Sequence, residues 1–89
     1  MSVIKKKITV KNAQGLHARP AALFVQVANK FDSRITVIHE SEEVNGKSIM
    51  GILMLGVEKG TVITIEADGE DAHLAVVELE KVVSSEEIK

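Results

Sequence analysis

His17 is the residue of this chain whose surroundings most suggest chemistry. It lies in the segment QGLHARPAAL (14–23), two residues after Gly15 and two before Arg19. Pro20 follows, and proline is tolerated in the first turn of a helix, because the N–H that it lacks would have no partner there. The segment therefore predicts a histidine at the start of a helix, with a cation beside it.

A histidine in this position can carry a phosphoryl group. The first N–H groups of a helix lack intrahelical acceptors and the helix dipole makes that end partly positive, so it attracts phosphate. The same field, together with Arg19, favours the neutral and nucleophilic imidazole. Each amide or guanidinium contact contributes about 0.3–2 kcal/mol, so a transferred phosphate is held without being trapped. The alternative interpretation is that His17 merely caps the helix.

The composition argues against several other kinds of site. The 89 residues include no cysteine, which excludes disulfides, thiolate nucleophiles and cysteine metal sites. With no tryptophan, no tyrosine and two phenylalanines, the chain lacks the side chains of a nucleic-acid stacking surface. His39 and His73 have no neighbouring metal-ligand pattern, so we expect no metal and no cofactor. No apolar run could span a membrane, and we expect a cytoplasmic protein without membrane or nucleic-acid partners.

The elements that position His17 follow from the spacing of apolar residues. Alternating or β-branched stretches predict strands over 3–10, 34–39 and 61–67, with a short strand ending at 45–46. Helical spacing predicts helices over about 18–29, 48–56 and 72–83. The order β-α-β-β-α-β-α within one domain (1–89) predicts an α+β fold with the helices on one face of a sheet. The two middle strands should form an antiparallel hairpin.

The helix that begins at Ser48 is a second candidate site. Serine is a preferred N-cap, which by itself would account for this residue. The segment that follows is apolar nearly all round, more than one buried face requires, so some of it should be exposed. We expect Ile49, Met50 and Leu53 to form a docking patch, since methionine adapts to several partners. The alternative is a helix that is deeply buried.

Two segments resemble the HPr family, the histidine-containing phosphocarriers of the bacterial phosphotransferase system. GLHARPAA (15–22) is similar to the active-site segment of that family, and NGKSIMGILMLG (45–56) is similar to its regulatory-serine helix. The expected order of elements matches as well. The resemblance implies a two-layer, open-faced β-sandwich, in which a four-stranded antiparallel sheet carries three helices on one face.

The resemblance also implies roles for single residues. His17 would accept phosphate on Nδ1 from phosphorylated Enzyme I and donate it to enzyme IIA domains, with Arg19 assisting the transfer. Gly15, His17, Ala18 and Arg19 would form the phosphate site. Gln14 stands where many members of the family have a small polar side chain that can cap the phosphate. The chain would then be a phosphoryl-group carrier rather than a stand-alone enzyme.

A regulatory role for Ser48 is a further implication of the resemblance, because it matches the serine that HPr kinase/phosphorylase modifies. The docking patch, extended by Leu16, would contact Enzyme I, IIA domains, the kinase and a transcriptional regulator, and we expect a monomer. A rival interpretation is a regulatory binding module of the same fold that signals through the phosphorylation state of Ser48. The carrier requires a reactive His17, whereas the module does not.

Overall fold

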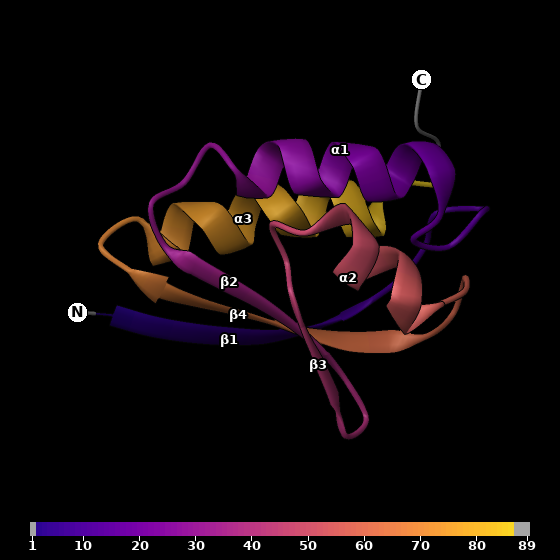
Figure 1. Cartoon of the computed structure of the whole chain (residues 1–89), viewed down its shortest axis with the longest axis horizontal. Helices are drawn as coiled ribbons and strands as arrows, with labels where there is room; N and C mark the ends of the chain where they lie inside the picture. Colours follow the sequence, from indigo (N-terminus) through magenta and orange to yellow (C-terminus); the bar gives the residue numbers. More distant parts are fainter. Residues whose placement is uncertain (1, 87–89) are drawn as a thin grey trace.

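Within residues 2–86, which the computed structural model describes, four strands form one antiparallel sheet with the order β1-β4-β2-β3. The strands are β1 (Ser2–Thr9), β2 (Arg34–His39), β3 (Glu42–Asn45) and β4 (Val62–Gly69), and the helices are α1 (Ala18–Ala28), α2 (Ile49–Leu55) and α3 (Ala72–Ser84). The helices lie on one face of the sheet (Figure 1). The predicted fold class and order of elements are confirmed.

The central position of β4 explains why this strand is longer than predicted. The sequence predicted a strand over 61–67, whereas β4 extends to Gly69. β4 pairs with β1 along one edge and with β2 along the other, so that Asp68 has Val3 on one side and Arg34 on the other. Pairing on both edges keeps Asp68 extended, and Gly69 still pairs with Ser2 of β1. The predicted hairpin is confirmed, since β2 and β3 pair antiparallel.

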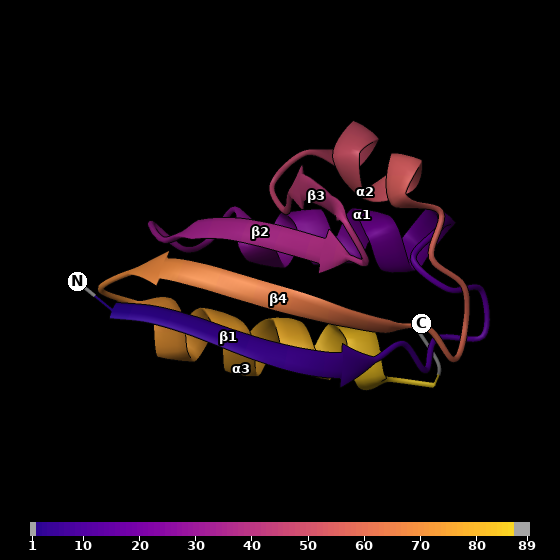
Figure 2. The same cartoon turned by 90° about the horizontal axis from the view of Figure 1, so that it is seen from below.

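The core lies between the sheet and the pair α1 and α3. Along β4 the side chains alternate, with Ile63, Ile65 and Ala67 buried. Phe24 of α1 is fully buried, which contributes about 1.5–3 kcal/mol for a side chain of this size. Both helices bury alanines, which lets them pack together on the sheet. Figure 2 shows α3 behind β1 and β4.

A carboxylate joins the start of α3 to the loop before β2. The carboxylate of Asp71 accepts hydrogen bonds from the N–H groups of Asp32 (2.9 Å) and Ser33 (3.0 Å) and from the hydroxyl of Ser33. These donors, the Ser33 hydroxyl first, favour the charged carboxylate and hold the pKa of Asp71 below its ordinary value. The joint lies at the end of the sheet where α3 begins, on the left in Figure 1.

The variant Asp71→Asn is expected to lower the melting temperature at neutral pH, because an amide replaces the charged acceptor of these bonds. Folding lowers the pKa of Asp71, so its stabilisation is fully present above the ordinary value of 3.8 and is lost as the pH falls through the folded pKa. Thermal unfolding of both proteins as a function of pH checks this. The difference in melting temperature should narrow in acid, and a constant difference would contradict the account.

Candidate functional site

The loop before His17 turns tightly at Gly15. Its φ of +67° lies in the left-handed region, and its N–H donates to the carbonyl oxygen of Asn12 at 3.0 Å. A Cβ at this position would lie 2.4 Å from the carbonyl oxygen of Val57, so the turn needs glycine. Because the N–H of Gly15 already donates to Asn12 within the loop, this N–H is not free to donate to a phosphate, as the expected phosphate site would require. The contribution of Gly15 is the turn itself.

Leu16 anchors the loop in the core. Its side chain has no exposed surface (0%), and its N–H donates to the carbonyl oxygen of Val57 at 3.0 Å. The docking role predicted for Leu16 is therefore wrong, because a fully buried side chain cannot contact a partner. Val57 comes directly after Gly56, the residue that caps the end of α2. The histidine loop is thus bonded to the segment that follows α2.

The imidazole of His17 is free at the start of α1. His17 is the N-cap residue with an extended backbone (φ −125°, ψ 163°), and its side chain makes no capping hydrogen bond. The residue is half-buried, so part of the ring is accessible. Among the residues described, none is hydrogen-bonded to the ring. Side-chain capping therefore does not account for a histidine at this position.

Two backbone amides and one cation follow His17 in the first turn of α1. The N–H groups of Ala18 and Arg19 lie in the first turn of α1, before any intrahelical bond can form. Pro20 is the third helical residue, is buried and has no N–H. The side chain of Arg19 is exposed and has no ion-pair partner within residues 2–86. This end of α1 can therefore receive an anion without first breaking a bond.

The backbone is strained next to the histidine. Ala18 has a φ of +50°, a conformation that L-residues with a side chain rarely adopt and that costs of order 1–3 kcal/mol. The strain occurs where the extended backbone of His17 gives way to the helix. No sequence pattern indicated it, since alanine is an ordinary helix-forming residue. The surrounding packing must therefore impose this conformation.

Ser48 caps α2, as predicted. Its Oγ accepts a hydrogen bond from the N–H of Gly51 at 3.1 Å, and its backbone is extended. The residue is half-buried, with its hydroxyl at the N-terminus of the helix. Capping alone accounts for a serine here, so phosphorylation of Ser48 stays a prediction.

The apolar side chains of α2 divide into a buried and an exposed set. Ile52 and Leu55 are buried, whereas the exposed fractions of Ile49, Met50, Leu53 and Met54 are 40%, 63%, 38% and 75%. We call these four residues the α2 surface. The interpretation of α2 as a helix buried all round is wrong. Met54 was missing from the predicted patch, although its spacing of four residues from Met50 places it on the same helix face.

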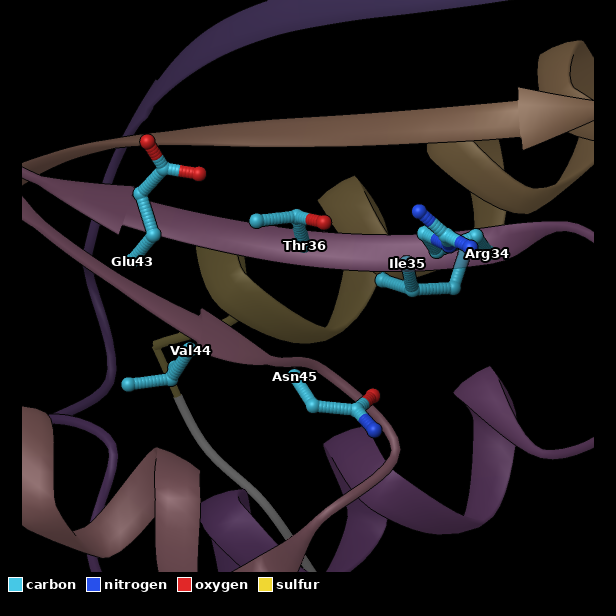
Figure 3. Close-up of a pocket in the computed structure, with 6 residues that line it drawn as sticks. All are labelled: Arg34, Ile35, Thr36, Glu43, Val44 and Asn45. Carbon is cyan, nitrogen blue, oxygen red and sulfur yellow. The ribbon is translucent and has the colours of Figure 1, made fainter.

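Among the residues described, the other histidines and the carboxylates do not form a metal site. His39 lies 3.8 Å from the carboxylate of Glu40, His73 is exposed, and the described part of the chain holds no group of three metal-ligating side chains. A hollow of about 250 Å³ lies between β2 and β3 (Figure 3), and it includes no residue of the 14–23 segment. It is lined by Arg34, Ile35, Thr36, Glu43, Val44 and Asn45. This hollow is therefore separate from His17.

Comparison with known proteins identifies the family. Residues 4–85 match the family model for the PTS HPr component phosphorylation site. The chain belongs to the HPr family. The phosphocarrier protein HPr of Xylella fastidiosa is 46% identical over 74 residues, which cover 83% of each chain. The HPr-like protein Crh of Bacillus subtilis is 44% identical over 84 residues, or 94% of this chain and 99% of Crh.

Solved structures of HPr proteins have the same fold. A crystal structure of the phosphocarrier HPr from Bacillus anthracis gives a TM-score of 0.90 at 43% identity, covering 93% of this chain and 99% of that one. The predicted family and the open-faced sandwich are confirmed. Crh of Bacillus subtilis, with a TM-score of 0.75, was crystallised as a domain-swapped dimer, so a monomer stays a prediction for this chain. Within residues 2–86, every helix is too short or too polar to cross a bilayer.

The variant Ala18→Gly should leave the free energy of unfolding unchanged or raise it by up to about 1 kcal/mol. Glycine adopts a positive φ without steric cost, and this offsets the entropy that glycine adds to the unfolded chain. The matched control is Ala22→Gly, at an exposed position within α1, which should lose about 1 kcal/mol. Urea unfolding measures both. Equal losses in the two variants would show that Ala18 is not strained.

Proposed function

We propose that this chain is a phosphoryl carrier that receives the group on the imidazole of His17. The observation that supports the proposal most strongly is the free ring at the start of α1, beside the unpaired amides of Ala18 and Arg19. Membership of the HPr family supports the same chemistry. In this role His17 is the nucleophile, and Arg19 with the two amides binds the transferred phosphate.

The transfer consists of two displacements at phosphorus. The lone pair of Nδ1 of His17 attacks the phosphoryl group carried by Enzyme I, and a P–N bond forms as the bond to the donor breaks. In the second step a nucleophile of a IIA domain attacks the same phosphorus atom, and the imidazole leaves with its electron pair. The amides of Ala18 and Arg19 stabilise the negative oxygens in both steps. No cofactor enters either displacement.

The α2 surface is the proposed docking site for Enzyme I and IIA domains. Its four apolar side chains are exposed, and such patches on a small protein mark interaction sites. The bond from Leu16 to Val57 holds the histidine loop next to the end of α2. A partner that docks on α2 would therefore meet the His17 loop at a fixed distance.

Phosphorylation of Ser48 is the proposed means of regulation. A phosphate on Oγ would add about two negative charges directly beside the apolar α2 surface, which opposes docking of a partner. At the N-terminus of α2 the dipole favours such a charge, so the helix need not unfold. HPr kinase/phosphorylase and a transcriptional regulator are the proposed partners of this state. The rival role is that of a regulatory module without phosphate relay, and the similarity to Crh, whose solution structure is described as that of the Bacillus subtilis catabolite repression HPr, supports a regulatory role.

Incubation with Enzyme I and phosphoenolpyruvate tests the carrier. We expect acid-labile, alkali-stable label that mass spectrometry maps to His17. His17→Ala should abolish the label, whereas the control His73→Ala, at an exposed position of α3, should not change it. A His17→Ala protein that is labelled at the rate of the wild type would refute the assignment.

The same protein, incubated with ATP and HPr kinase, tests the rival. The regulatory proposal expects label on Ser48 that Ser48→Ala removes. Label on Ser48 together with no transfer from Enzyme I to His17 would establish the module in place of the carrier. Label on His17 from Enzyme I would exclude a module without relay.

A further inference from the structure

Asn12 is one of two buried polar residues among those described, with 1% of its surface exposed. Its side-chain Nδ2 donates to two carbonyl oxygens, that of Val82 at 2.9 Å and that of Ser85 at 2.6 Å. Both carbonyls belong to the C-terminal end of α3, where backbone oxygens have lost their intrahelical donors. Asn12 therefore supplies donors that the helix end needs.

The backbone around Asn12 extends the same contact. The N–H of Lys11 donates to the carbonyl oxygen of Val83 at 3.0 Å, so the segment before the histidine loop is fixed to α3 by three hydrogen bonds. The carbonyl oxygen of Asn12 in turn accepts the N–H of Gly15 at 3.0 Å. One residue thus holds the end of α3 with its side chain and the turn at Gly15 with its backbone.

The hydrogen bonds of Lys11 and Asn12 to α3 precede the turn at Gly15 in the chain, and a further backbone hydrogen bond, from Leu16, follows it. The N–H of Leu16 donates to Val57 at 3.0 Å, directly before His17. The end of α3 and the start of α1 occupy the same end of the molecule (Figures 1 and 2). The backbone that leads into His17 is therefore held between α3 and the segment after α2.

The state of the Asn12 side-chain oxygen, Oδ1, indicates that asparagine is present for the two hydrogen bonds that its Nδ2 donates. Oδ1 is buried and has no hydrogen-bond partner among the residues described. An unpaired buried acceptor costs about 1–3 kcal/mol, which an apolar side chain would avoid. Packing alone therefore does not explain an amide side chain at this position, because an apolar side chain would fill the space without this cost. Its distinctive capacity is to donate to two carbonyls at once.

We propose that Asn12 is a positioning residue for phosphoryl transfer to and from His17. The inference rests on the proposed carrier function and extends it to a residue that does not touch the phosphate. Phosphoryl transfer depends on alignment of the attacking nitrogen with phosphorus, and misplacement of about 1 Å can cost up to about 100-fold in rate. Asn12 holds the loop, and the loop sets the direction of the imidazole.

The test is the rate at which phosphorylated Enzyme I transfers its phosphoryl group to His17 of the variants Asn12→Ala and Asn12→Ser. With Asn12→Ala we expect kcat to fall about 10-fold through loss of alignment, while KM changes little because the α2 surface is intact. Asn12→Ser retains one hydroxyl donor and should lose less. It also keeps the proposal testable if the alanine variant does not fold. Amide hydrogen exchange at Gly15 and Leu16 should accelerate in both variants.

Ser33→Ala is the matched control. Ser33 is the other buried polar residue, and its hydroxyl bonds to Asp71 at the far end of the sheet. This variant should lower the melting temperature but leave kcat and the exchange of Gly15 and Leu16 unchanged. All rates are measured at a temperature where every variant is folded.

The outcomes separate the two proposals. Loss of kcat in the folded Asn12 variants, with none in Ser33→Ala, supports the positioning role. A wild-type protein that accepts phosphate together with Asn12 variants of unchanged kcat overturns the positioning role alone, as does an equal loss in Ser33→Ala. A wild-type protein that accepts no phosphate from Enzyme I overturns the carrier function, and the positioning role with it.

Discussion

The site depends on the backbone at His17, the single residue at which an extended loop becomes the helix α1. Gly15 and Ala18, on either side, both have a positive φ. Such a path does not form by local preference, because alanine avoids this region. It is held by hydrogen bonds from the loop to its neighbours, namely those of Asn12 to α3 and that of Leu16 to Val57. This path leaves the imidazole free and the first amides of α1 unpaired.

The same bonds relate the histidine to the surface that partners would contact. The α2 surface ends at Met54, two residues before Gly56, and the carbonyl oxygen of Val57 accepts the bond from the N–H of Leu16. Ser48 lies at the opposite end of α2, where its hydroxyl caps the helix. His17, the α2 surface and Ser48 are therefore arranged around one short helix. In the proposed carrier, several partners would use this one surface without a substrate pocket.

Much of the fold and the centre of the site could be predicted from the sequence. Periodicity located the strands β1, β2 and β4 and the helices α1 and α3, and Ser48 with the apolar segment after it located α2. The short strand β3 was expected only as a stretch that ends at 45–46, and the motif around His17 located the candidate site. The burial of Leu16 could not be predicted, because a leucine before a histidine is compatible with core and surface alike. Asn12 bonds to carbonyls about 70 positions away, and no local pattern reports such a contact. The strain at Ala18 is likewise imposed by tertiary contacts, against the preference of the residue.

The most direct measurement of the central claim is the amide NMR spectrum of the protein before and after phosphorylation. If the phosphate on His17 is bound by the start of α1, the amide protons of Ala18 and Arg19 should shift strongly downfield. Those of Gly15 and Leu16 should move little, because they already donate to Asn12 and Val57. Phosphorylation of His17 that leaves the Ala18 and Arg19 resonances in place would contradict the account.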